Sequence, residues 1–406
     1  MKQDRHRVLL VCTHPVQYFA PILRRMALHP KLDIQVAYCS LQGAQPGTDP
    51  EFGIAFAWDV PLLEGYPWIQ VLNRSWHAGV GRFWGLFNPG LWGLVRDGGH
   101  DAIILLTGYR YASFWVALAA AKLHGKAVLL ATDASELRAR DRRGWKSAAK
   151  RWFWPALFRL ADIVIVPSTR GVELMRSLGL QHDRIVLTPY VVDNDWWSER
   201  AAAVERVTVR RAWGVPEDAP VVLFCAKLQS WKRPLDLLRA FAVSNVREAH
   251  LVFAGEGPLR QGLQAEACLL GLNDRVRFIG FANQTQLPGI YRASDLMVLP
   301  SEYEPFGVVV NEAMLCGCPV VVSDRVGAGY DLITSGQNGF VFPFGDVQSL
   351  AAILRETLMA PDRLRVLGDS ARRRMQSWAP SDNINAVARA VAMARELKGD
   401  LDRMNL

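Results

Sequence analysis

Apolar residues in this chain gather in short, unbroken runs that alternate with amphipathic stretches. An unbroken run such as Val8 to Cys12 is typical of a strand buried on both faces of a parallel sheet. The stretches between several runs carry helical spacing, as around Ile22, Leu23 and Met26. Predicted strands of the first half occupy residues 8–12, 32–38, 102–106, 127–131, 162–167 and 184–187. This alternation predicts a doubly wound α/β domain.

A second alternating series follows in the other half of the chain. Its predicted strands occupy residues 221–226, 250–254, 276–279, 296–300, 320–323 and 340–342. Between the two series, Pro189 to Trp197 indicates a hinge, and a charged helix continues to about Gly214. With 406 residues, the chain also exceeds what one core usually supports. We therefore expect Rossmann-like domains at 1–195 and 196–380, facing across a cleft, and a C-terminal helix at 381–406 that could return to the first domain.

The stretch from Gln42 to Gly99 breaks this rhythm. It is rich in glycine, proline and aromatic residues and predicts an irregular excursion over one end of the first sheet. Two interpretations stay open for its aromatic side chains. They pack locally, or they form a wall for a sugar or lipid acceptor.

Composition places the chain among ordinary folded proteins, because 50% of the residues are apolar and 21% are charged. The six cysteines are scattered, without a disulfide spacing or a zinc pair, which favours a reducing compartment. The apolar run at 8–12 is too short for a secretion signal, and no run approaches the ~20 residues that cross a bilayer. We expect a cytoplasmic protein, or one peripheral at the inner face of a membrane.

The formal net charge of +8 favours an anionic partner. A nucleotide diphosphate, a lipid surface and a nucleic acid would each fit, and charge alone does not choose among them.

The strongest candidates for ligand-binding residues lie at 301–318, where a strand ends and Pro305 stands at the expected start of a helix. This predicts Glu304 at the lip of the helix and Glu312 about two turns along it. Free amides and the positive dipole end would suit a phosphate or a sugar hydroxyl, and Gly307 would let a ligand approach. A second helix entry is predicted at 323–329, after the next strand. The alternatives are that Glu304 only caps the helix and that Glu312 is an exposed helical residue.

The two glutamates separated by seven residues, with Pro-Phe-Gly between them, resemble the donor-site signature of the family 4 retaining glycosyltransferases of the GT-B fold. The continuation through Glu312-Ala313-Met314 and Gly317-Cys318-Pro319-Val320 is similar as well. The resemblance implies that Glu304, with the amides of Phe306, Gly307 and Val308, holds the donor sugar. It implies that Glu312 binds the ribose hydroxyls.

Residues 223–234 resemble the strand and loop that bring two cations to the donor diphosphate in this family. Lys227 and Lys232 would be these cations, although the first is more often arginine and each alone could be a solvated surface lysine. Gly255-Glu256-Gly257-Pro258 and residues 277–281 resemble the next turn and the base-binding strand. Phe281 and Ala282 would then meet the nucleobase.

The first domain departs from the usual pattern of the family. A Thr-His-Pro-Val-Gln-Tyr sequence at 13–18 replaces the glycine-rich loop and is similar to the start of one subgroup, which makes His14 and Gln17 candidates for the cleft. Asp133 stands where many members have a histidine, and a carboxylate accepts but cannot donate hydrogen bonds. We count Asp133 with Glu304 and Lys232 as candidate catalytic residues, and a structural role for His14 stays open.

The segment from Arg138 to Arg159 interleaves basic residues with large aromatics. Such a pattern is typical of a helix lying on an anionic membrane, and the alternative is a solvated helix with an aromatic stripe facing the core.

The resemblance implies transfer from a nucleotide diphosphate sugar to a sugar, glycan or lipid-linked acceptor, in the synthesis of cell-surface polysaccharide or glycolipid. It implies no bound metal and no other cofactor, because two cations serve the diphosphate, and no nucleic-acid partner. Two rival classes remain. The chain could be another enzyme of similar fold, such as a nucleotide-sugar epimerase or an inverting transferase, or a binding protein without activity.

Overall fold

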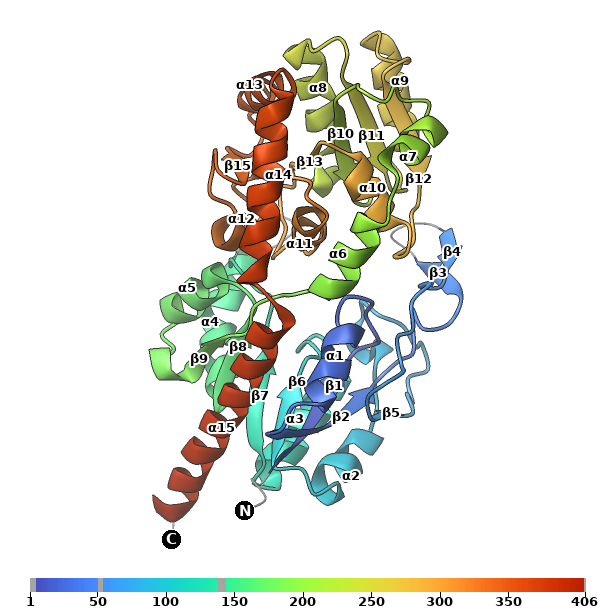
Figure 1. The fold of residues 1–406 in the computed structure, drawn as a ribbon. Coiled ribbons are helices and arrows are strands. Elements are labelled where there is room, and N and C mark those ends of the chain that lie inside the picture. Colours follow the sequence, from blue (N-terminus) through green and yellow to red (C-terminus); the bar gives the residue numbers. More distant parts are fainter. Residues whose placement is uncertain (1–4, 50–53, 138–143, 405–406) are drawn as a thin grey trace. The chain divides into compact units, whose positions relative to one another are not determined.

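The computed structural model of the chain describes residues 5–49, 54–137 and 144–404. The chain divides into two compact units. Unit 1 comprises residues 1–47, 61–190 and 380–406, and unit 2 comprises residues 48–60 and 191–379. Each unit is built around its own parallel sheet, in accordance with the predicted fold class (Figure 1).

The sheet of unit 1 has the strand order β5-β2-β1-β6-β7-β8-β9, and all its neighbours are parallel. Its central strands are buried on both faces, because helices cover both sides. The strands are β1 (His6–Cys12), β2 (Leu32–Tyr38), β5 (Trp68–Gln70), β6 (Ala102–Leu105), β7 (Ala127–Ala131), β8 (Ile163–Val166) and β9 (Ile185–Leu187).

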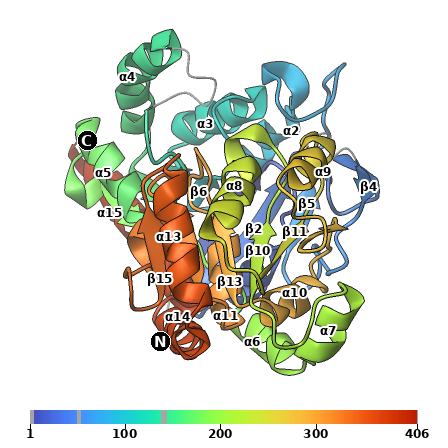
Figure 2. The same ribbon diagram turned by 90° about the horizontal axis from the view of Figure 1, so that it is seen from above.

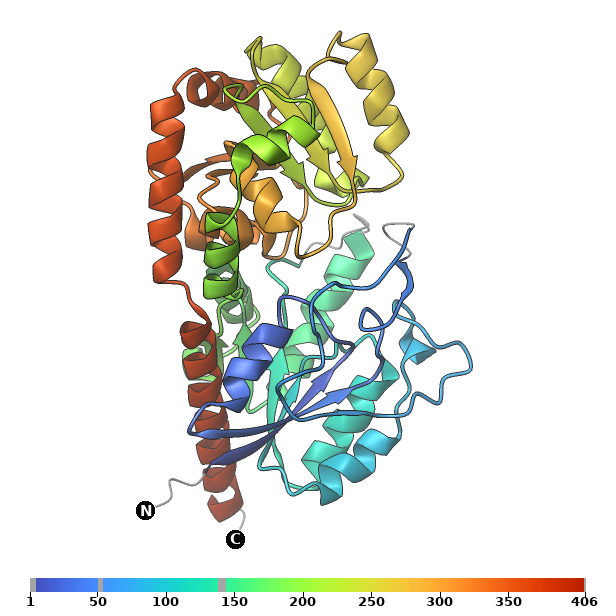
Figure 3. The ribbon, with the colours of Figure 1, turned by 45° about the vertical axis from the view of Figure 1, so that its right-hand side comes forward.

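The helices of unit 1 include the last helix of the chain, which packs against β7 and β8 and runs beside the sheet (Figure 3). The sequence raised this return as a possibility. The helices are α1 (Ala20–Ala27), α2 (Gly90–Asp97), α3 (Ala112–Leu123), α4 (Gly144–Arg159), α5 (Thr169–Ser177) and α15 (Pro380–Met404), with single turns η1 (Phe83–Gly85) and η2 (His182–Arg184).

The sheet of unit 2 has the order β12-β11-β10-β13-β14-β15 and is also parallel. Its strands are β10 (Val221–Cys225), β11 (His250–Ala254), β12 (Val276–Gly280), β13 (Leu296–Leu299), β14 (Val320–Ser323) and β15 (Gly339–Phe342). Its helices are α6 (Asn194–Ala202), α7 (Arg206–Ala212), α8 (Pro234–Ser244), α9 (Arg260–Leu269), α10 (Leu287–Ala293), α11 (Val309–Leu315), α12 (Gly327–Leu332), α13 (Val347–Leu358) and α14 (Pro361–Gln376), with the single turn η3 (Ser230–Lys232). Helices α8 and α13 lie side by side over the sheet (Figure 2).

The division differs from the expected domains in two places. The chain passes from unit 1 to unit 2 between Tyr190 and Val191 rather than at residue 195. Residues 48–60, which contain all but the first residue of the short strand β3 (Gly47–Asp49) and all of β4 (Ile54–Phe56), belong to unit 2 although the chain on both sides of them belongs to unit 1. Contacts with residues 281–285 explain this grouping, as shown below.

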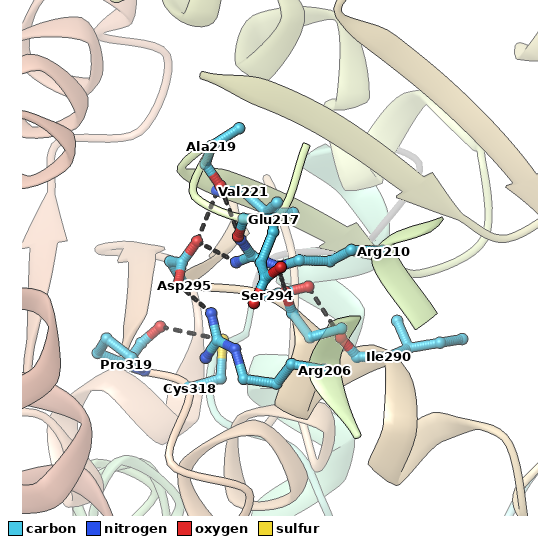
Figure 4. A network of polar contacts seen from close by, with 11 residues as sticks. Arg206, Arg210, Glu217, Ala219, Val221, Ile290, Ser294, Asp295, Cys318 and Pro319 are labelled. Carbon is cyan, nitrogen blue, oxygen red and sulfur yellow. Dashed lines mark hydrogen bonds and ion pairs between the residues drawn. The ribbon is translucent and has the colours of Figure 1, made fainter. Parts of the chain in front are cut away.

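An ion-pair network holds the amino edge of the sheet of unit 2 (Figure 4). Asp295, just before β13, accepts hydrogen bonds from Arg206 and Arg210 of α7, each at 2.6 Å, and from the backbone amide of Val221 at 2.7 Å. Arg210 is only 3% exposed, and its guanidinium also donates to the carbonyl of Ala219 at 2.9 Å. The network therefore ties α7 to the starts of β10 and β13, at the edge opposite the loops that carry the predicted site.

Candidate functional site

The predicted donor residues lie in loops at one edge of the sheet of unit 2. Because its strands are parallel, the segments that follow them leave the sheet at the carboxyl edge, where open α/β sheets bind ligands. Lys227 and Lys232 follow β10, Phe281 follows β12, and Glu304 follows β13. The fold thus brings to one edge residues that are up to 77 positions apart in the sequence, from Lys227 to Glu304.

Lys232 and Glu304 form an ion pair between the ends of two neighbouring strands. The ammonium of Lys232 donates to Oε2 of Glu304, and their side chains are 18% and 16% exposed. The backbone supports this approach, because the amide of Glu302 donates to the carbonyl of Trp231 at 2.8 Å. Lys232 is therefore not a solvated surface lysine in this structure.

The helix expected to start at Pro305 begins later, as α11 at Val309. Gly307 explains the difference, because its φ of +98° is a left-handed conformation that does not continue a helix. A Cβ at this position would lie 3.1 Å from Cγ of Glu304 and 3.2 Å from Cγ1 of Val326. Gly307 is thus required by the backbone and by protein contacts, and Glu304 lies outside the helix rather than at its cap.

The segment before α11 is fixed against the entry of α12. The carbonyls of Glu304 and Phe306 accept hydrogen bonds from the amides of Gly327 and Ala328 at 3.0 and 2.8 Å. These two amides, at the second predicted helix entry, are therefore already hydrogen-bonded within the protein. Phe306 is 1% exposed, and its ring stacks on Trp378 with centroids 6.4 Å apart. Only the backbone of this residue is therefore available to a sugar donor.

Glu312 is buried in unit 2, which contradicts the interpretation as an exposed helical residue. It lies on α11, is 4% exposed, and its Oε2 accepts a 2.9 Å hydrogen bond from the hydroxyl of Tyr291 on α10. The same hydroxyl lies 3.5 Å from Sγ of Cys225. Burial raises the pKa of Glu312 to about 7, although the hydrogen bond from Tyr291 lowers it. A carboxyl group with this pKa changes its charge near neutral pH.

Lys227 lies in a loop whose backbone is held by the turn after β11. A Cβ on Gly255 would lie 2.1 Å from the carbonyl oxygen of Ala226, so glycine allows the two loops to touch. The amide of Leu228 donates to the carbonyl of Glu256 at 2.9 Å. This contact fixes the backbone on the C-terminal side of Lys227, whose side chain is half-buried.

Phe281 packs against aromatic residues that the sequence did not associate with it. The rings of Phe281 and Phe56 have centroids 4.5 Å apart, and the ring of Trp58 lies 6.4 Å from that of Phe281. A hydrogen bond joins the same two segments, in which Nδ2 of Asn283 donates to the carbonyl of Ala57 at 2.8 Å. Residues 56–59 therefore pack against Phe281, which the sequence predicts to meet the nucleobase together with the half-buried Ala282.

Asp59 makes a second connection between the same two segments. The amide of Thr285 donates to Oδ1 of Asp59 at 3.2 Å, and the hydroxyl of Thr285 also donates to this carboxylate. Asn283 accepts in return from the amide of Asp59 at 3.3 Å. We call residues 56–59 the aromatic strap.

The candidates of unit 1 lie at the carboxyl edge of its own sheet. His14 and Gln17 are half-buried in the loop after β1, and Asp133 is exposed after β7. Tyr18, from the same loop as His14, meets the ring of Tyr190 edge-on with centroids 6.0 Å apart. Burial raises the pKa of Tyr190, and the nearby Tyr18 and Asp133 raise it further. Tyr190, which the sequence did not single out, thus connects the two loops.

Two family profiles match successive parts of the chain. The family described as Glycosyl transferase 4-like domain matches residues 2–191, and the family described as Glycosyl transferases group 1 matches residues 205–374. The two matches follow the two sheets.

Curated relatives match part of the chain. An uncharacterised glycosyltransferase of Methanocaldococcus jannaschii is 40% identical over 189 residues, which are 46% of this chain and 48% of that protein. A D-inositol 3-phosphate glycosyltransferase of Thermobispora bispora is 32% identical over 268 residues, which are 56% of this chain and 62% of that protein. The chain spans about half the length of the curated relatives it matches.

Solved structures share the fold over nearly the whole chain. Anabaena HepE in complex with UDP and glucose has a TM-score of 0.72 at 20% identity, covering 96% of this chain and 100% of that chain. The lipopolysaccharide outer core galactosyltransferase WaaB has a TM-score of 0.65 at 16% identity, covering 95% and 99%. These likenesses confirm two Rossmann-like domains.

Proposed function

Because the chain belongs to the family 4 glycosyltransferases of the GT-B fold, we propose that it transfers a glycosyl group from a nucleoside diphosphate sugar to an acceptor hydroxyl with retention at the anomeric carbon. The ion pair of Lys232 and Glu304 carries the proposal. A cation and a carboxylate, both less than one-fifth exposed, stand together at the edge where such sheets bind ligands. The complex of HepE with UDP and glucose supports a nucleoside diphosphate sugar as the donor.

Each part of the donor has a proposed partner in unit 2. Lys227 and Lys232 bind the diphosphate, while Glu304 and the backbone from Phe306 to Val308 hold the sugar. Glu312 accepts hydrogen bonds from the ribose hydroxyls, for which its carboxylate is suited when ionised. Phe281 and Ala282 meet the nucleobase.

The proposed reaction uses no protein nucleophile. The bond between the anomeric carbon and the diphosphate breaks, and the acceptor oxygen forms the new bond on the same face. The departing diphosphate oxygen takes the proton of the acceptor hydroxyl, while the two lysines stabilise the charge that develops on it. In unit 1, Asp133 is our proposed catalytic residue, and His14 and Gln17 are proposed substrate contacts. The lysines replace a metal ion in this scheme, so transfer should continue in the presence of EDTA.

The proposed acceptor is a hexosyl-accepting glycan or lipid-linked sugar of cell-surface polysaccharide or glycolipid synthesis. WaaB, named as a lipopolysaccharide outer core galactosyltransferase, supports this class. We also propose that the segment from Arg138 to Arg159 contacts an anionic membrane. Residues 138–143 lie outside the described residues, whereas α4 exposes Arg151 and Trp152. Within the described parts of the chain, no helix is long and apolar enough to cross a membrane.

Transfer from UDP-, GDP- and ADP-linked sugars tests the proposal, with release of the nucleoside diphosphate and the NMR coupling of the anomeric proton as readouts. We expect one donor to be consumed with its anomeric configuration kept in the product. Glu304→Ala and Lys232→Ala should each slow consumption by about 10²–10³. Wild-type turnover in both variants contradicts the site assignment. An inverted product contradicts retention, and isomerisation of the donor without an acceptor would indicate an epimerase.

A further inference from the structure

Large apolar side chains are exposed in one short stretch of unit 1. Between residues 68 and 84, the exposed ones are Trp68, Ile69, Leu72, Trp76, Val80, Phe83 and Trp84. Trp76 is 96% exposed and Trp84 64%. Exposed apolar residues gathered in one segment mark a surface that binds a partner or a membrane more often than singly scattered ones do. We call residues 72–84 the aromatic loop.

Hydrogen bonds within the aromatic loop and with its continuation hold it in shape. The side chain of Asn73 donates to the carbonyl of Gly85 at 2.9 Å and accepts from the amide of Phe87 at 3.0 Å. The amide of Gly79 donates to the carbonyl of Gly85 at 3.0 Å. The rings of Phe83 and Trp84 meet edge-on at 5.1 Å. These contacts fix the conformation of the aromatic loop. In this conformation its aromatic side chains are exposed.

A turn at residues 108–111 connects the aromatic loop to α4. The hydroxyl of Tyr111 accepts a 3.1 Å hydrogen bond from the amide of Gly81 in the loop. Two residues earlier, the ring of Tyr109 lies 5.6 Å from that of Phe153 of α4, and its hydroxyl accepts from Nε1 of Trp154 at 3.1 Å. Helix α4 and the segment before α2 lie along one side of unit 1 (Figure 2). On α4, Trp152 is 86% exposed.

Positive charge accompanies these exposed rings. Residues 68–84, 108–116 and 144–159 contain seven Lys or Arg and no Asp or Glu. Arg74, Arg82, Arg110 and Arg151 are exposed. Tryptophan prefers the interfacial region of a bilayer, and each Lys or Arg near an anionic surface adds about 1 kcal/mol of attraction. The chemistry of this surface thus fits the headgroups of anionic lipids.

We infer that the aromatic loop and α4 form one membrane-docking surface, in which Trp76, Phe83 and Trp84 enter the headgroup region of an anionic bilayer. The inference deepens the proposed function, on which it rests for a lipid-linked acceptor, by giving unit 1 an apolar insertion element besides the basic helix. Apolar insertion and charge attraction differ in their response to salt, because salt screens only the second.

Sedimentation with vesicles tests the inference, using phosphatidylcholine alone and phosphatidylcholine mixed with phosphatidylglycerol. We expect the wild type to bind the mixed vesicles. The triple variant Trp76→Ser, Phe83→Ser, Trp84→Ser should bind about tenfold more weakly or less, at low and high salt alike. Lys150→Glu with Arg151→Glu should weaken binding mainly at low salt. A control variant, Leu269→Ser with Met359→Ser, removes two exposed apolar residues from unit 2 (83% and 71% exposed) and should bind like the wild type.

Unchanged sedimentation of the triple variant would overturn the inference, as would binding of the wild type to neither vesicle. Loss of transfer to an acceptor in solution, with vesicle binding intact, would instead identify the loop as an acceptor wall and also overturn it. Donor-dependent thermal stabilisation of the same variants separates this result from the proposed function. It should persist in the triple variant, whereas its absence in the wild type would count against the transferase itself.

Discussion

The hydroxyl of Tyr291 donates a 2.9 Å hydrogen bond to Oε2 of Glu312, and both side chains are buried in unit 2. Burial raises the pKa of Glu312 from 4.5 to about 7. The folded protein therefore holds this proton more tightly than the unfolded chain. The contribution of Glu312 to the free energy of unfolding is present below about pH 4.5 and is lost as the pH rises to about 7. Urea unfolding at several pH values should show this fall in the wild type but not in Glu312→Gln, and equal pH profiles would refute the assignment.

The same pair predicts how donor affinity depends on pH. Ribose hydroxyls bind better to an ionised carboxylate, so affinity should increase as the pH rises through about 7. Tyr291→Phe removes a hydrogen bond that lowers the pKa of Glu312, so it should move the midpoint to higher pH. Calorimetric titration with the preferred nucleoside diphosphate measures this midpoint. A variant that binds weakly with an unmoved midpoint would assign Tyr291 a merely structural role.

Lys232→Ala should lower kcat by about 10²–10³, because a cation aimed at the developing diphosphate charge acts mainly in the transition state. Lys232→Arg should keep part of the activity. Arg239→Ala provides a matched control, because Arg239 lies on the following helix with its side chain 51% exposed and paired to Glu266. The control should retain wild-type rates. Equal rates for Lys232→Ala and the control would remove Lys232 from the mechanism.

The aromatic strap should affect donor binding more than the chemical step. Phe56→Ala and Trp58→Ala each remove a ring that packs on Phe281, and aromatic pairs contribute about 0.5–1.5 kcal/mol. We expect KM for the donor to rise about three- to tenfold with kcat little changed. Trp76→Ala removes an exposed ring from unit 1 and should leave this KM unaltered. An unchanged KM in both variants would mean that the aromatic strap is not part of the nucleobase site.

The network around Asp295 should determine stability and not donor recognition. Asp295→Ala leaves the buried Arg210 without its carboxylate, which should cost about 3–5 kcal/mol in the free energy of unfolding. Asp369→Ala breaks a 3.9 Å pair whose partners are about half exposed and should cost less than about 1 kcal/mol. Urea denaturation measures both. Similar losses in the two variants would contradict the role given to the network.

Much of the fold could be predicted from the chain, because strands buried on both faces leave unbroken apolar runs. The predicted strands at 32–38 and 250–254 have the observed bounds. The strands β3, β4 and β5 were missed, since three residues carry no period. The start of α11 was misplaced because the left-handed conformation of Gly307 cannot be read from Pro305.

The site was predictable only where residues lie in one ordered motif. Glu304 and Glu312 came from such a motif, and the structure adds the contact of Glu304 with Lys232. Tyr291 and Phe56 left no signal, because each acts through a contact with a residue far away in the sequence. The exposure of the aromatic loop was equally hidden, since tryptophans in an irregular stretch fit local packing as well as a binding surface.

Thermal-shift measurement with nucleoside diphosphate sugars tests whether unit 2 binds the donor through its two lysines, because a ligand that binds only the folded state raises Tm. We predict that one UDP-, GDP- or ADP-linked sugar raises the Tm of the wild type. Lys227→Ala with Lys232→Ala should abolish this rise, while Arg239→Ala should keep it. A rise that persists in the double lysine variant, or no rise with any of these donors, would contradict the proposed donor site.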